Sequence, residues 1–158
     1  MVRVTLAVGS STALLLSTAL AQSDTVTFNG TISDTCTVVA GSAGTLAAST
    51  DNTVIASSEA GGSAGTATVT TNSTSFEITL AAATAFDSAP ASAAANTTFA
   101  AEFDASGATT ASDVAAGVAQ AAGSGTTNLS IDASATKSTG TYEAGSYSLT
   151  VTVTCATP

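Results

Sequence analysis

Two segments near the ends of the chain alternate apolar and polar residues with a period of two. The first has Val26, Phe28, Gly30, Ile32, Asp34, Cys36 and Val38 in one phase. The second has Tyr147, Leu149, Val151, Val153 and Cys155 in one phase. Such a period, with one apolar side, is typical of a β-strand that is buried on one face. We therefore predict a first and a last strand here, with a bend or bulge near Asp34, which interrupts the apolar phase.

Cys36 and Cys155 are the only cysteines, and each falls in the apolar phase of its predicted strand. Two cysteines in an exported chain favour one disulfide, which would join the first strand to the last. Closing a loop of about 120 residues stabilises the fold by roughly 4–5 kcal/mol on the chain-entropy account. Two free thiols are the alternative. A metal site is not expected, because the chain has no His and no C-x-x-C motif.

Residues 1–21 have the features of a secretory signal peptide. Arg3 is followed by an apolar run that ends in Ala19-Leu20-Ala21, a small-x-small pattern that suits cleavage after Ala21. We expect residues 22–158 to be exported as a single domain, with a retained N-terminal anchor as the alternative. No later stretch is apolar enough to predict a membrane span.

Shorter alternating stretches lie between the two end segments, at residues 66–71, 76–80, 99–103 and 129–132. The links between them, roughly 40–65, 82–96, 104–125 and 134–145, are rich in Gly, Ser, Ala, Asn and Thr. Several short strands joined by turn-rich links are typical of a sandwich, so we predict an all-β fold.

The segment 112–123 also carries the signals of one short helix. Ser112 could cap it, Asp113 suits its first turn, and Gly123 could end it. Gly117 in its middle opposes a helix, and a surface loop is the alternative.

The charge of the chain excludes several classes of partner. Two bases stand against 11 Asp and Glu, and after cleavage only Lys137 remains, which we expect to be exposed in a loop. Nucleic acid and anionic lipid are therefore not expected as partners, since both need clustered Lys and Arg. Catalytic triads need a general base, and the chain has no His. We predict that the protein is not an enzyme and needs no cofactor or metal.

Two stretches resemble the opening and the ending of chaperone–usher pilins and spore coat protein U-like domains. The first is residues 25–38, TVTFNGTISDTCTV, a strand with a central Gly that runs into a Cys. The second is residues 141–154, TYEAGSYSLTVTVT, in which Gly145-Ser146-Tyr147 opens a Thr/Val-alternating strand.

The resemblance implies an immunoglobulin-like sandwich that lacks one strand. A periplasmic chaperone would fill the resulting groove first, and the extension of the next subunit would then replace it at an outer-membrane usher. Tyr147, Leu149, Val151 and Val153 would line the groove. Val26, Phe28 and Ile32 would belong either to the donated strand or to the first core strand.

The chain departs from this family in two ways. Only residues 22–27 precede Phe28, which is short for a donor arm followed by a complete first strand. Typical fimbrial subunits also pair the first-strand Cys with one on the next strand, whereas here the partner would be Cys155. Either departure could mean that the sandwich completes itself.

Two functions follow from these features. The first is a structural subunit of a bacterial surface fibre, a pilus, fimbria or coat, that forms a homopolymer by β-strand complementation. The alternative is a self-complete, secreted β-sandwich that serves in binding or cell adhesion. Both place the protein in the periplasm in transit and then at the cell surface.

Overall fold

The structure, a computed structural model, describes residues 21–158. The predicted signal peptide, but for Ala21, therefore lies outside the described residues. The chain divides into one unit that ends at Thr31 and a second that begins at Ile32, and each is described by itself. In the first unit, residues 21–31 form no helix or strand and their side chains are exposed. The prediction of a first strand from Val26 is thus wrong for residues 26–35, and the strand begins only at Cys36.

The second unit is built from strands alone, and no helix occurs between residues 21 and 158. The strands are β1 (Cys36–Ala40), β2 (Ala47–Ala48), β3 (Val54–Ala56), β4 (Gly65–Thr71), β5 (Glu77–Ala81), β6 (Thr97–Gly107), β7 (Ala111–Ala115), β8 (Gln120–Ala121), β9 (Gly125–Lys137) and β10 (Thr152–Ala156). The predicted all-β fold is confirmed, and the immunoglobulin-like topology stays a prediction. The helix considered at 112–123 is wrong, because its first residues pair with β6 as strand β7.

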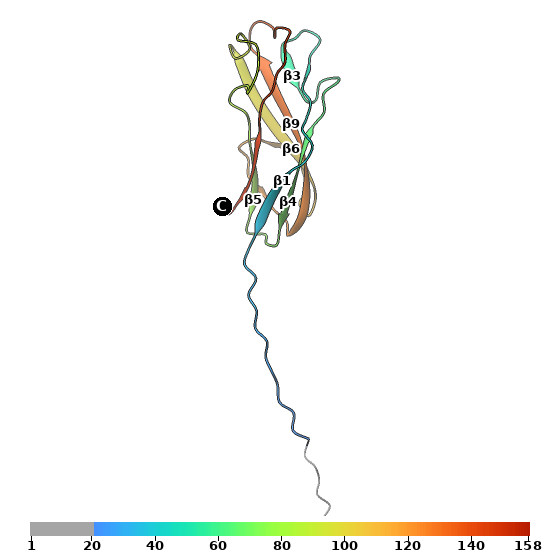
Figure 1. Cartoon of the computed structure of the whole chain (residues 1–158), viewed down its shortest axis with the longest axis vertical. Coiled ribbons are helices and arrows are strands. Elements are labelled where there is room, and N and C mark those ends of the chain that lie inside the picture. The colour runs from blue at the N-terminus through green and yellow to red at the C-terminus, as the bar shows by residue number, and fades with distance from the viewer. Residues whose placement is uncertain (1–20) are drawn as a thin grey trace, which may run out of the picture. The chain divides into compact units, whose positions relative to one another are not determined.

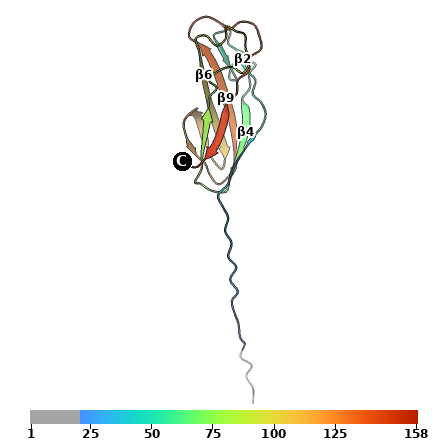
Figure 2. The same ribbon diagram turned by 60° about the vertical axis from the view of Figure 1, so that its left-hand side comes forward.

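The larger sheet is organised around β9, its longest strand (Figure 1). One edge of β9 pairs with β4 and then, further along, with β3, while its other edge pairs with β6. β1 extends the sheet beyond β4, β2 beyond β3, and β7 beyond β6, all antiparallel. Figure 2 shows β6, β9 and β4 from a second side. β1 is therefore a terminal strand of this sheet, and among the strands of residues 21–158 it pairs with β4 alone.

The smaller sheet has three strands in the order β10-β5-β8. It packs on the larger sheet through one apolar core, to which β5 contributes Ile78 and Leu80 and the facing sheet contributes Val69, Phe103 and Leu129. These five side chains are at most 2% exposed. The alternation seen in the sequence explains the burial, since every second residue of each strand points inward.

A second apolar cluster lies at the other end of the strands. The rings of Phe86, Phe99, Tyr142 and Tyr147 meet edge to face, with centroids 4.9–6.0 Å apart. They cover Ile55 and Ala135, which are buried. Edge-to-face pairs of this kind are favoured by the charge distribution of aromatic rings. The few aromatic side chains of the chain are thus concentrated where the connections are longest.

Lys137 does not lie exposed in a loop, and that prediction is wrong. It is the last residue of β9 and is buried. Its Nζ donates hydrogen bonds to the carbonyl oxygens of Ser92 and Ala95, at 3.1 and 2.8 Å, and lies 5.1 Å from the ring centre of Tyr142. The ammonium group therefore ties the 88–96 connection to the sheet.

Candidate strand-acceptor groove

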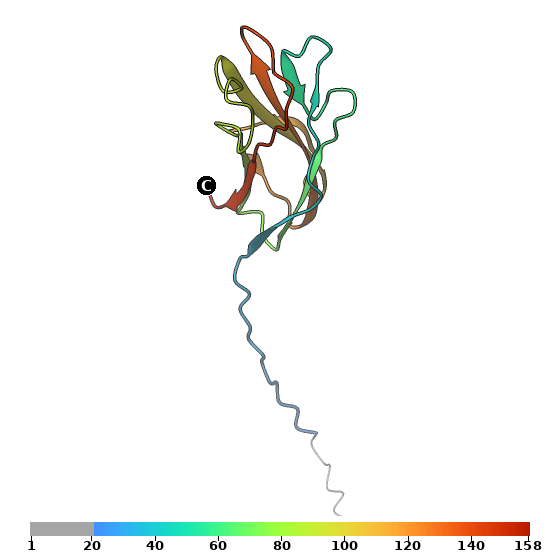
Figure 3. The same ribbon diagram turned by 45° about the horizontal axis from the view of Figure 1, so that its top comes forward.

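The candidate site lies where the two sheets leave an edge open on the same side of the core. β1 ends the larger sheet and β10 ends the smaller one, and the two strands are not paired with each other. Figure 3 shows them on separate layers, β1 in blue and the C-terminal strand in red. Each has main-chain groups on one side that no neighbouring strand uses, which makes both edges competent to pair with a further strand.

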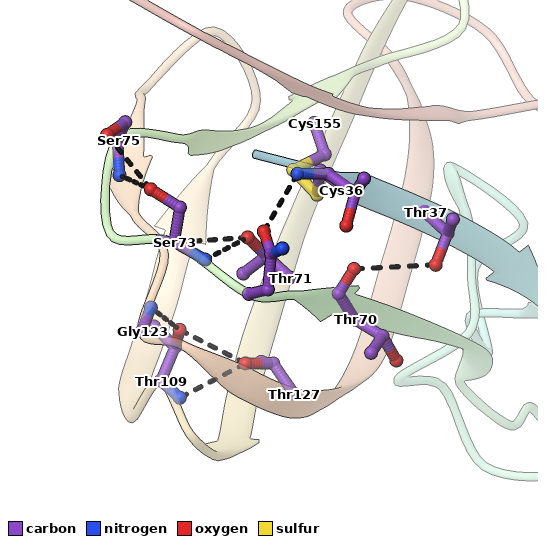
Figure 4. Close-up of a disulfide and its surroundings, with 12 residues drawn as sticks. Cys36, Thr37, Thr70, Thr71, Ser73, Ser75, Thr109, Gly123, Thr127 and Cys155 are labelled. Carbon is purple, nitrogen blue, oxygen red and sulfur yellow. Dashed lines mark hydrogen bonds between the residues drawn. A yellow bond between two sulfur atoms is a disulfide. The ribbon is translucent and has the colours of Figure 1, made fainter. Parts of the chain in front are cut away.

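One disulfide joins these two strands. Cys36, the first residue of β1, is bonded to Cys155 of β10, with 6.3 Å between their Cα atoms (Figure 4). The predicted bridge between the first and last strands is confirmed. Neighbouring strands of a sheet lie about 4.8 Å apart, so a strand inserted between two others needs nearly 10 Å. No strand fits between β1 and β10 at the bridge.

Beyond the bridge the space between the strands opens into a groove of about 540 Å³. Val38, Ala40 and residues 42–44 form one wall, and residues 149–153 form the other. Leu46, Ala67, Ile131 and Ala133 contribute apolar surface, and no charged side chain lines the groove. Many of these residues are Gly, Ala or Ser, so the groove has room for larger side chains from outside.

The walls carry apolar side chains that the fold leaves partly uncovered. Val38 falls in the inward phase of β1 yet is 38% exposed, and Leu149, Val151 and Val153 are half-buried. Residues 149–151 belong to no strand and lie between the single bridge of Ser148 to Ser88 and the start of β10. The predicted last strand is therefore shorter than its alternation indicated, beginning at Thr152.

Of the four residues predicted to line a groove, three do so and one does not. Leu149, Val151 and Val153 line it, whereas Tyr147 is absent from its walls and packs in the aromatic cluster. Val38 and Ala40 were missed as wall residues, although their position after Cys36 in the same phase was a usable signal. Leu46 lies in the predicted link 40–65, and Ala133 directly follows the predicted strand at 129–132; no feature of the sequence marked either as a wall residue.

The three N-terminal candidates are exposed. Val26, Phe28 and Ile32 are 78%, 90% and 86% exposed. None of them lies in a strand, so the hypothesis that they form the first core strand is wrong. Leaving large apolar side chains in water is unfavourable by about 1.5–3 kcal/mol each relative to full burial. Their alternation with polar residues remains that of a strand buried on one face.

Residues 33–35, which precede β1, are fixed by the turn between β4 and β5. The Asn72 side chain accepts a hydrogen bond from the Thr35 N–H at 2.8 Å and donates one to the Ser33 carbonyl at 2.9 Å. The Ser73 hydroxyl donates to the Asp34 carboxylate at 3.0 Å. Residues 33–35 therefore extend from the N-terminal end of β1, on the side of the disulfide away from the groove-lining residues Val38 and Ala40.

A second hollow, of about 530 Å³, lies beside the aromatic cluster and is lined by Asn52, Tyr142, Glu143, Tyr147 and their neighbours. The Tyr147 hydroxyl donates to the Glu143 carbonyl at 2.7 Å. Burial, and then the nearby Glu143 carboxylate, raise the pKa of Tyr147 above its usual value of 10.0. Both effects favour the neutral phenol over the phenolate.

We also searched the described residues for a metal site and for a membrane-spanning helix. No group of three potential metal ligands occurs within residues 21–158. Among these same residues, no helix is long and apolar enough to cross a membrane. No protein-family model, curated protein or solved structure matches this chain. The groove and the exposed apolar residues of the N-terminal segment are therefore the features that bear on function.

Proposed function

We propose that this protein is a structural subunit of an extracellular fibre, in which residues 26–32 of one copy fill the groove of the next. The proposal rests on the presence, in one chain, of an uncovered apolar groove and of an exposed apolar segment that could cover it. The groove has two open strand edges and uncovered apolar walls, and the segment has exposed Val26, Phe28 and Ile32 in one phase.

Strand addition would satisfy both features at once. Main-chain hydrogen bonds to the edge of β1 or β10 would give affinity, while alternate side chains would enter the groove. Val26, Phe28 and Ile32 are the side chains suited to enter, and Phe28 is the bulkiest of them. A head-to-tail contact of this kind leaves a free groove at one end and a free segment at the other, so it adds subunits in a line wherever the rotation between them does not close a ring.

The same geometry supports the partners that the resemblance implies. A subunit with an unfilled groove exposes two sheet edges and an apolar cleft, which favours aggregation. A periplasmic chaperone that covers the groove during export, and an usher that catalyses the exchange, would remove this hazard. The disulfide fits an oxidising compartment, in keeping with secretion.

Two complementary variants of residues 22–158 test the proposal. Phe28→Asp should destroy the donated segment and leave the groove intact, whereas Val151→Asp should destroy the groove and leave the segment intact. We expect wild-type protein to polymerise, each variant alone to stay monomeric, and an equimolar mixture of the two to give a one-to-one dimer in light scattering. Val118→Asp, at an exposed loop residue, is the matched control and should polymerise normally.

A wild-type monomer that unfolds cooperatively and does not bind a peptide of residues 22–35 would contradict strand exchange. It would support the alternative, a self-complete secreted module that binds a ligand.

A further inference from the structure

We propose that the Asn72–Ser73 turn selects the occupant of the groove, by preventing each copy from filling its own groove with its own N-terminal segment. This inference rests on the proposed function. The groove alone cannot distinguish the chain's own N-terminal segment from that of another copy, because the two segments are identical.

Self-filling is compatible with the sequence. If the chain reversed within residues 31–35 and passed the bridge on its solvent side, residues 26–30 could fold back on the free edge of β1 beyond the disulfide. Gly30 would then lie opposite Val38, and Phe28 opposite Ala40. Residues directly opposite each other in an antiparallel pair share a face, so the apolar phase would enter the chain's own groove.

Self-filling would also have a large statistical advantage. A segment joined by a short linker has an effective concentration of about 1 mM. At micromolar subunit concentration, the chain's own segment therefore competes about a thousandfold better than the same segment of another copy. Polymerisation requires something in the fold that opposes the hairpin.

The contacts of Asn72 and Ser73 provide that opposition. The Asn72 amide spans residues 33 and 35, its oxygen accepting from Thr35 N–H and its nitrogen donating to Ser33 O. The Asn72 N–H donates to the Thr35 carbonyl at 3.3 Å, and Ser73 Oγ donates to Asp34. All of these hydrogen bonds hold residues 33–35 in line with β1, and a reversal of the chain at these residues would break them.

The test uses Asn72→Ala in residues 22–158, with Asn128→Ala as the matched control. Asn128 is an exposed asparagine of β9, whose side chain accepts one long hydrogen bond, 3.4 Å, from Thr68. We expect Asn72→Ala to lower the polymer fraction at least about tenfold and to yield monomers that no longer bind a labelled 22–35 peptide, because their groove is filled. The control should polymerise like the wild type.

A second variant guards against a folding defect at Asn72. Asp34→Ala removes only the contact with Ser73, and we expect a smaller shift toward closed monomers in a protein that still unfolds cooperatively. Wild-type protein that polymerises while Asn72→Ala polymerises equally well would overturn this inference and leave the proposed function standing. Monomers of Asn72→Ala that still bind the peptide would overturn it too. Wild-type protein that never polymerises would instead overturn the proposed function.

Discussion

Val38 and Val153 each lie two residues from one half of the same disulfide, and both line the groove that opens beyond it. One covalent bond thus joins the two strands that form the groove walls. The remaining contact between the sheets is the apolar core, which β10 meets only through half-buried side chains. The groove therefore depends on the disulfide more than the rest of the fold does.

Replacing both cysteines, Cys36→Ser with Cys155→Ser, should lower the free energy of unfolding by about 2–5 kcal/mol, because the unfolded chain regains the freedom of a long loop. Denaturant unfolding followed by circular dichroism measures this change. Wild-type protein unfolded in the presence of a reductant should match the double variant. Equal midpoints for the variant and the oxidised wild type would contradict this role of the bridge.

Leu129→Ala should cost about 2–5 kcal/mol, since Leu129 is 2% exposed in the core between the sheets and its truncation leaves a cavity. Urea unfolding at neutral pH measures the loss. Val118→Ala, at a side chain that is 52% exposed, is the control and should change stability by less than about 0.5 kcal/mol. Similar effects for the two variants would show that the core is placed incorrectly.

Lys137→Met should lower the free energy of unfolding by about 1–3 kcal/mol, because the carbonyls of Ser92 and Ala95 lose their donor. Met keeps most of the apolar stem, which separates the hydrogen bonds from packing. Amide hydrogen exchange in residues 92–96 should also become faster. Thr136→Met, at the exposed neighbouring position of β9, should leave both measurements nearly unchanged. Unaltered hydrogen exchange in Lys137→Met would contradict the role of Lys137 in holding residues 92–96 to the sheet.

Tyr147 should make the fold sensitive to alkaline pH. Its pKa is raised in the folded protein, so the stability that its neutral phenol contributes is fully present below the unfolded pKa of about 10. It is lost as the pH rises from there toward the folded pKa. Tyr147→Phe should therefore show a shallower decline in unfolding free energy between pH 9 and pH 11. Parallel declines in the two proteins would count against this assignment.

Much of the strand content could be predicted from alternation alone. β4 and β5 were placed within a residue or two, because every second side chain of each strand is buried. β6 and β9 are longer than predicted, since much of their inward face is Ala, a residue that carries almost no apolar signal although Ala105 and Ala135 are buried.

The segment 26–35 shows the opposite failure. Its alternation is clean, but a strand also needs a partner strand, and within residues 21–158 no strand pairs with residues 26–35. The alternation shows which side chains would share a buried face. It does not show whether the same chain or another copy supplies the surface that buries them. The groove was predicted through Leu149, Val151 and Val153, and the phase of β1 also offered Val38 and Ala40. Most of its other wall residues are small and come from four further segments, so the sequence did not mark them.

The burial of Lys137 has one more consequence. Proteases of the trypsin type cut after Lys or Arg, and Lys137 is the only such residue between positions 21 and 158. Its side chain is enclosed, and the bond that follows it lies at the end of β9, whose last residue pairs with β6. The folded protein therefore offers such enzymes no accessible cleavage site within these residues, a property that suits the extracellular role proposed above.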